Sequence, residues 1–398
     1  MTFQALAERL GVKDYPEVLN TYYPLPAGRE NEFCSMDLIC RLQEKFDLFG
    51  KYFDLVKQGW QEISQENGDR KAFIDAMSLC IRDLDCKSCR RMKYPKTDGT
   101  VAGNMLPLYG LLPSVEDAYK EYVTRGFTHE QALVNLEGFK INLEVVENHI
   151  LGVPGFTDLY ANWCVLYIKC KIFYHHGLNF EIHTSPSYNA FVLKNKKSGA
   201  LLPVFGNEIS IHKSGIPLGS NGAEEEEGSF IARFEETKTE YVGNPSRNIL
   251  VEQKRERFSK EEWELVYQPG DHDLSVHIPR NTDFSPEAVS RSLTEALELT
   301  KRCYPEWEPK AFYCCSWLLS PILQDILGTE SKISSFALRY TRYPRKSEGK
   351  SPMSYVYPLG VKSYEELPEN TSLQRGLKKV YLNGDFVYDT SGVILIEK

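Results

Sequence analysis

A strand, a helix and a second strand follow one another between Asp273 and Pro321 with few connecting residues, and this unit limits the folds open to the chain. Apolar and polar side chains alternate over residues 273–278, which predicts a strand with His277 on its polar face. Pro279 ends the strand because proline has no amide hydrogen to donate. Ser285 then predicts a helix cap, and the apolar stripe that follows runs to about residue 303.

The second strand of this unit is an almost unbroken apolar run at residues 311–317, as expected of a strand buried on both faces. Such a unit usually forms a right-handed crossover between parallel strands. A ligand then lies beyond the carboxyl ends of the strands, near the start of the helix. The sequence therefore predicts a pocket between Pro279 and Ser285.

Composition limits the class of protein. The chain has 398 residues, 42% of them hydrophobic, which predicts two globular domains. A net charge of -8 without a dense lysine or arginine cluster argues against a nucleic-acid partner. No apolar stretch approaches the roughly 20 residues of a membrane span, and no secretory signal opens the chain, so we expect a cytoplasmic protein without a membrane partner. Its ten cysteines are then expected to be mostly reduced thiols.

Three local motifs carry no chemistry on their pattern alone. Cys86 and Cys89 form a CxxC without a second ligand pair, so we expect a structural role. His175 and His176 are adjacent, with no carboxylate at a suitable spacing, and we predict no metal site. The glycine-rich run at 215–223 precedes four glutamates, which would repel a phosphate, and we expect a mobile loop.

The pattern along the chain changes near residue 175. Before it, apolar residues recur at helical spacing over residues 36–63, with a break near Gly50, and then over 73–84, 132–150 and 159–173. A capping box at Thr128–Gln131 starts the third of these stripes. After it, period-two strands are expected at 178–183, 189–193, 208–212 and 230–234. We therefore predict a helical domain over 1–175 and a strand-rich domain over 176–398.

Beyond Pro321 the pattern predicts a short helix to Leu327, a strand at 335–340 and a further strand at 355–359. A last helix is expected to start at Asn370 or Thr371 and to break at Asn383–Gly384.

Several segments resemble a family of bacterial acyltransferases with a helical N-acyltransferase amino-terminal domain and a GNAT-like carboxyl-terminal domain. In the carboxyl half they are His277–Pro279, Ser285–Ala288 with Ser292, CCSWLLSP at 314–321 and LPENTSLQRG at 367–376. In the amino half and the joint after it they are residues 122–127, Trp163, Phe180–Glu181 and residues 241–245. The resemblance implies an α+β fold, in which a GNAT-like mixed α/β domain has a central, mostly antiparallel sheet.

The resemblance also implies a coenzyme site. Acyl-coenzyme A is the expected co-substrate, with its pyrophosphate at the start of the helix at Ser285, where unpaired amides favour an anion. Ile278, Arg280, Asn281, Ser285 and Trp317 are the residues expected to bind it. The loop at 280–284 departs from the usual pattern because it has no glycine and includes Asp283.

Acyl transfer to an amine needs a base and a group that protonates the leaving thiolate. His277, at the strand end, and Glu181 are the alternative bases, although each also fits a structural role. Cys314 or Cys315 is a candidate thiolate nucleophile, although a buried strand raises a thiol pKa. Ser316 shares a face with Cys314 in a regular strand and is a further candidate for the pocket.

The sequence thus predicts an enzyme that transfers an acyl group from coenzyme A to an acceptor, expected to be an amine in a small molecule or peptide. The alternative is a GNAT-like ligand- or protein-binding module without catalysis, which the glycine-free loop favours. The sequence sets neither the acceptor nor the oligomeric state.

Overall fold

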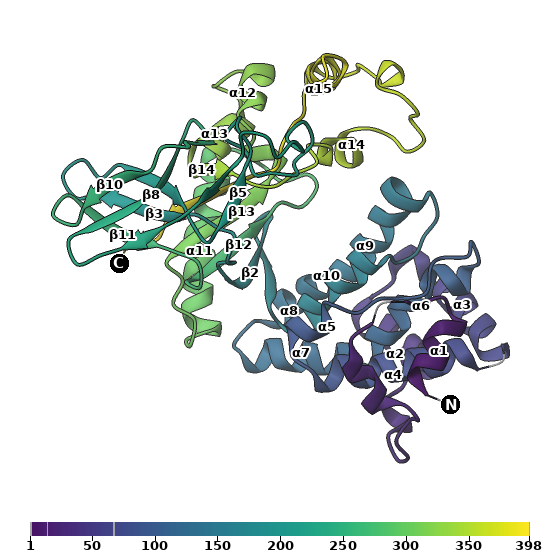
Figure 1. Ribbon diagram of the computed structural model, residues 1–398. Coiled ribbons are helices and arrows are strands. Elements are labelled where there is room, and N and C mark those ends of the chain that lie inside the picture. The colour runs from purple at the N-terminus through teal and green to yellow at the C-terminus, as the bar shows by residue number, and fades with distance from the viewer. Residues whose placement is uncertain (1, 14, 67, 398) are drawn as a thin grey trace. The chain divides into compact units, whose positions relative to one another are not determined.

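The protein divides into two compact units, with the division between Tyr174 and His175. The computed structural model describes residues 2–13, 15–66 and 68–397 (Figure 1). Within these residues, no helix is both long enough and apolar enough to cross a membrane. The predicted fold class, a helical first part followed by a mixed and mostly antiparallel sheet domain, is confirmed.

The first unit is built from helices. Their bounds are α1 Phe3–Arg9, α2 Met36–Phe46, α3 Phe53–Gln65, α4 Asp69–Asp83, α5 Cys86–Cys89, α6 Val101–Leu111, α7 Val115–Thr124, α8 His129–Leu136, α9 Gly138–Val146 and α10 Asp158–Ile168. The predicted break near Gly50 separates α2 from α3, and the capping box at Thr128 starts α8. The stripe predicted over 132–150 is divided between α8 and α9. Cys89 is buried, with its thiol directed at carbonyl oxygens, including that of Cys80.

The second unit contains a six-stranded sheet in the order β1-β2-β12-β13-β15-β14. The strands are β1 Ile172–His175, β2 Leu178–Thr184, β12 His272–His277, β13 Ala311–Ser316, β14 Thr341–Pro344 and β15 Thr390–Leu395. β12 and β13 run parallel, as predicted, and α11 (Pro286–Cys303) connects them. The pairs β2–β12, β13–β15 and β14–β15 are antiparallel.

Residues between β2 and β12 form a second sheet, which packs against the first. Its order is β10-β8-β4-β3-β11, with β7 and β9 also paired to β8. The strands are β3 Phe191–Asn195, β4 Leu201–Phe205, β7 Glu235–Glu236, β8 Glu240–Arg247, β9 Leu250–Val251, β10 Glu256–Ser259 and β11 Trp263–Tyr267; β5 Ile209–Ile211 and β6 Phe230–Ala232 pair separately. One core joins the sheets, with Val192, Phe205 and Tyr267 against Tyr313, Tyr343 and Val393.

The glycine-rich run at 215–223 is tied down rather than free. Ser220 is fully buried, and Asn221 donates its side-chain amide to the carbonyl of Glu348 at 2.7 Å. No helix begins within these residues.

The remaining helices are α12 Ile322–Leu327, α13 Lys332–Leu338, α14 Ser351–Val356 and α15 Ser372–Leu382. The predicted helices that end at Leu327 and start at Thr371 are confirmed. The predicted strand at 335–340 is wrong, because Ser331 caps a helix there and the alternating apolar pattern leaves Leu338 exposed. The strand predicted at 355–359 is also wrong, since α14 covers its first residues and an irregular segment the rest.

Candidate functional site

The parallel strands β12 and β13 separate at their carboxyl ends. Their paired positions run from Asp273↔Ala311 to Ser275↔Tyr313. Beyond that point β12 keeps its pairing with β2 as far as His277, and β13 keeps its pairing with β15 as far as Ser316. The sheet therefore opens between β12 and β13 beside His277.

The two predicted bases form one pair at this opening. The His277 Nε2 atom lies 2.9 Å from the Glu181 Oε2 atom. The Glu181 side chain is 8% exposed and that of His277 is 29% exposed. A carboxylate that hydrogen-bonds one ring nitrogen holds the imidazole in one orientation. His277 is therefore the solvent-facing member and Glu181 the buried member of a carboxylate–histidine pair.

A second carboxylate–histidine pair lies at the other end of the same two strands, and the sequence interpretation missed it. The His183 Nδ1 atom is 2.7 Å from Asp273 Oδ1, and the Tyr267 hydroxyl donates to Asp273 Oδ2. Burial raises the pKa of the fully enclosed Asp273 carboxyl group. The sequence signal for this pair is the alternation of Asn179, Glu181 and His183. These three residues form a polar face on β2 that matches the polar face of β12.

The strand alternation places Cys314 and Ser316 on the opposite face from Tyr313. Tyr313 is paired with Ser275, which shares the face of His277. Cys314 is fully buried, and burial raises the pKa of its thiol well above the usual range. The Ser316 hydroxyl accepts a hydrogen bond from the Leu318 amide at 3.1 Å, so it caps a short 3-10 turn that begins at Trp317.

The residues predicted for coenzyme binding lie in different surroundings. Ile278 and Trp317 pack in one apolar cluster with Leu318 and Tyr357. Arg280 is exposed, and its guanidinium donates to the Tyr355 carbonyl at 3.2 Å.

The loop before α11 uses asparagine and aspartate where glycine was expected. Asn281 has a φ of 63°, a left-handed conformation that asparagine adopts more readily than most residues. Ser285 precedes the helix, but its hydroxyl does not cap it. Instead, the Asp283 carboxylate accepts from the Ser285 amide and hydroxyl, each at 2.9 Å. The hydrogen bond from the Ser285 amide holds the pKa of the Asp283 carboxyl group below its usual range.

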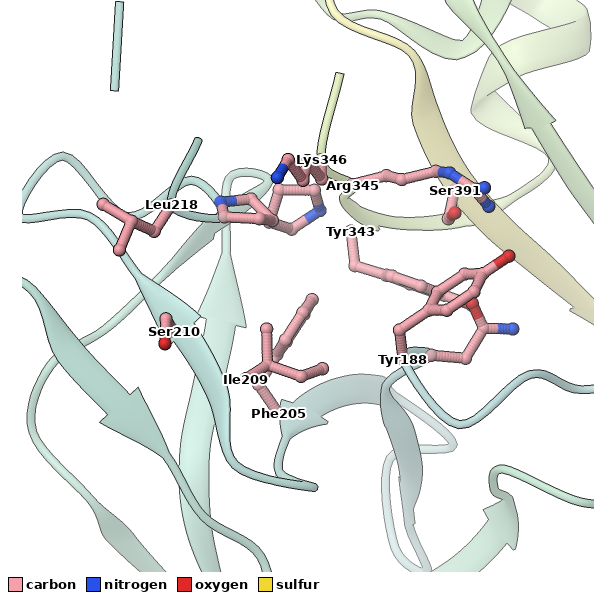
Figure 2. Close-up of a pocket in the computed structure, with 12 residues that line it drawn as sticks. Tyr188, Phe205, Ile209, Ser210, Leu218, Tyr343, Arg345, Lys346 and Ser391 are labelled. Carbon is pink, nitrogen blue, oxygen red and sulfur yellow. The ribbon is translucent and has the colours of Figure 1, made fainter. Parts of the chain in front are cut away.

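A cavity of about 450 Å³ lies on the sheet face that includes Tyr343 and Ser391 (Figure 2). Ser391 is paired with both Cys315 and Tyr343 across β15, so the cavity adjoins the face that bears His277. Its walls are mostly apolar and aromatic, and they include Phe205, Ile209, Pro217 and Leu218 from the segment between β2 and β12. Arg345 and Lys346 supply two positive charges.

Arg345 is held by aromatic groups in this cavity. Its guanidinium donates to the Tyr313 hydroxyl at 3.1 Å and lies 4.7 Å from the centre of the Tyr188 ring. In the described parts of the chain, no carboxylate lies within ion-pair distance of Arg345. A partly buried guanidinium without a counter-ion favours an anionic ligand.

Comparisons with known proteins agree with this architecture. The family model of the GNAT-like C-terminal domain matches residues 178–394. Solved structures of an acyltransferase with decanoyl-CoA (TM-score 0.65, 14% identity) and of an acyltransferase with decanoyl-CoA and teicoplanin (TM-score 0.63, 16% identity) each match over 100% of both chains. A mutant acyltransferase with octanoyl-CoA matches equally well, with a TM-score of 0.65 at 14% identity. A comparison with curated proteins found no match.

Proposed function

The chain belongs to the family of the GNAT-like C-terminal domain, and from this membership we propose that it transfers an acyl group from coenzyme A to an amine. The observation that carries the proposal is the His277–Glu181 pair at the point where β12 and β13 separate. Similar folds have been solved with octanoyl-CoA and decanoyl-CoA, which supports a medium-chain acyl donor.

In this proposal the opening between β12 and β13 takes the pantetheine arm. The main-chain groups of β12 next to His277 supply hydrogen bonds to its amides, as a strand partner would. The pyrophosphate lies at the start of α11, where the amides of Glu287 and Ala288 lie in the unpaired first turn. Arg280, in the adjacent loop, adds a positive charge in this proposal.

His277 removes the proton from the acceptor ammonium group before the nitrogen attacks the thioester carbonyl. The C–S bond then breaks as the amide C–N bond forms, and the coenzyme A thiolate that leaves takes a proton from the imidazolium. Glu181 stabilises the imidazolium that results and holds the ring in position. Direct attack needs no thiolate on the enzyme, which agrees with the burial of Cys314. We therefore favour direct transfer over a route through an acyl-cysteine.

The cavity at Arg345 is the proposed acceptor site. Aromatic walls and a guanidinium without a carboxylate partner fit a small molecule or peptide that carries both an apolar group and a carboxylate. One similar structure was solved with teicoplanin, which supports an acceptor of the small-molecule or peptide class.

Thermal unfolding tests the coenzyme part of the proposal. Octanoyl-CoA, decanoyl-CoA and free coenzyme A are each added to the full chain, and a ligand at 100 times its Kd should add about 2.7 kcal/mol of stability. If none of the three shifts the midpoint, the acyltransferase proposal is wrong.

Turnover tests the proposed base. Release of coenzyme A from octanoyl-CoA is followed with amines that carry a carboxylate, and each is compared with its amide. His277→Ala should lower kcat by about 10²–10⁴-fold, the usual contribution of a general base. His129→Asn, at an exposed position of α8 in the first unit, is the control and should leave kcat unchanged. Full activity of His277→Ala would remove His277 from the mechanism.

A catalytically inactive binding module is the second candidate, and Asp283 favours it. The Asp283 carboxylate already accepts a hydrogen bond from the Ser285 amide, and it places a negative charge beside the proposed pyrophosphate site. Asp283→Asn keeps the hydrogen bond and removes the charge. A large gain in coenzyme affinity in this variant, without turnover in either protein for any acceptor tried, would support the binding module over the enzyme.

A further inference from the structure

We propose that His175, His176 and Glu295 form a binding site for a divalent transition-metal ion such as Zn²⁺. Their ligand atoms lie within 4.8 Å of one another. The site is separate from the acyl-transfer chemistry, and neither proposal depends on the other.

The turn between β1 and β2 brings the two adjacent histidines together. Neighbouring residues of a regular strand point to opposite faces, which is why the sequence predicts no metal site here. In the structure, His176 and Gly177 form a two-residue connection with φ values of 43° and 91°, as a type I′ turn requires. The imidazole rings consequently lie 4.4 Å apart, centre to centre.

Glu295 completes the set from α11. Its Oε2 atom is 3.1 Å from His175 Nε2 and 2.8 Å from His176 Nε2. Two ligands of a tetrahedral Zn²⁺ ion, each about 2.0–2.1 Å from the metal, lie about 3.3–3.5 Å from each other. The Glu295 oxygen therefore needs to move away from each ring nitrogen by less than about 1 Å to admit the ion, and the ligand atoms of the two histidines lie within 4.8 Å of each other.

Hydrogen bonds from α11 and its preceding loop hold the turn in place. The Ser292 hydroxyl donates to the His175 carbonyl, and the Thr282 hydroxyl donates to the Gly177 carbonyl, both at 2.8 Å. A site whose supporting main chain is fixed in this way binds an ion with little reorganisation.

The chemistry of the ligands selects the ion. Two imidazole nitrogens and one carboxylate oxygen suit Zn²⁺, Co²⁺ or Ni²⁺, whereas Mg²⁺ and Ca²⁺ prefer sites made of oxygen. The His175 side chain is 14% exposed, while those of His176 and Glu295 are each 41% exposed, so solvent reaches the ion from one side. Water takes the fourth position. In the described part of the chain, this is the only group of three such residues.

Isothermal titration calorimetry with Zn²⁺ tests the proposal on the untagged full chain after chelator treatment and dialysis. We expect one equivalent to bind and the midpoint of thermal unfolding to rise. His176→Asn removes one ligand yet leaves an Asn-Gly pair, the residues most favoured in a type I′ turn, so the fold is retained. Glu295→Gln keeps the side-chain shape and removes the charge.

Each of these variants should weaken Zn²⁺ binding at least tenfold. Glu298→Gln is the matched control, with the same change at an exposed position one turn along α11, and its affinity should equal that of the wild type. Absence of saturable binding, or affinity unchanged in both ligand variants, would overturn the proposal. A thiolate-to-cobalt charge-transfer band with Co²⁺ would overturn it as well, because the ion would then lie on a cysteine such as the exposed Cys40.

Discussion

Glu181 and Asp273 are both buried carboxylates next to a histidine on the strand pair β2–β12, yet their surroundings differ. Asp273 is fully enclosed and receives the Tyr267 hydroxyl as well as His183. Glu181 contacts the partly exposed His277 beside the opening of the sheet. We therefore assign a structural role to the Asp273 pair and propose the chemical role for the Glu181 pair.

Tyr267→Phe should lower the free energy of unfolding by about 1–3 kcal/mol, because it leaves a buried carboxylate oxygen without its donor. Tyr343→Phe is the matched control from the same core. The Tyr343 hydroxyl is buried without a hydrogen-bond partner, so its removal should be neutral or stabilising. Urea denaturation measures both, and equal losses in the two variants would contradict this account of Asp273.

Cys314 should resist alkylation in the folded protein. Its thiol is buried and its pKa is raised well above the usual range, so the reactive thiolate is scarce. Iodoacetamide labelling followed by mass spectrometry should modify the exposed Cys40 and reach Cys314 only after denaturation. Native labelling of Cys314 at the rate of Cys40 would restore it as a candidate nucleophile.

Among the elements, α12 and α15 approach closely at Gly376, which explains the glycine at the end of the SLQRG segment. A Cβ atom there would lie 2.2 Å from the Ile326 Cγ2 atom. Gly376→Ala should therefore destabilise the protein by about 1–3 kcal/mol through overpacking, in spite of the gain of up to about 1 kcal/mol in helix propensity.

Ile326→Ala removes the methyl groups that obstruct the new side chain. The double variant should accordingly be more stable than the sum of the two single losses predicts, which a double-mutant cycle of thermal unfolding measures. If the stability losses of the two single variants simply add in the double variant, α12 and α15 move apart at Gly376 without strain.

The elements that the sequence predicted correctly are those whose pattern or cap lies within the element itself. In the strand–helix–strand unit at 273–316, the first strand alternates between polar and apolar residues and the helix has an apolar stripe at helical spacing. Helices α8 and α15 have capping boxes. β15 was missed because its central position in the sheet depends on β13 and β14, which are distant in sequence. The cluster of His175, His176 and Glu295 was not predicted for a similar reason, since Glu295 lies 120 residues from His175.

At the scale of the whole molecule, the two units are expected to unfold separately. Each has its own core, and chains with more than one domain commonly depart from two-state unfolding. Calorimetry should show two transitions, and free coenzyme A should raise only the one assigned by hydrogen exchange to residues 175–397. A single transition with equal calorimetric and van't Hoff enthalpies would contradict this expectation.

The segment between β2 and β12 leaves the six-stranded sheet and returns to it at neighbouring points. Ser185 and Asp271 are joined there by a main-chain hydrogen bond of 2.8 Å, and Gly270 donates back to Ser185 at 2.9 Å. The segment between these residues therefore starts and ends at one place on the six-stranded sheet, while its core side chains and the Tyr267 hydroxyl contact that sheet. Because this segment supplies most of the apolar wall of the Arg345 cavity, changes in its loops, for example at Pro217 and Leu218, would alter the proposed acceptor site and leave in place the strands that carry the proposed proton-transfer pair.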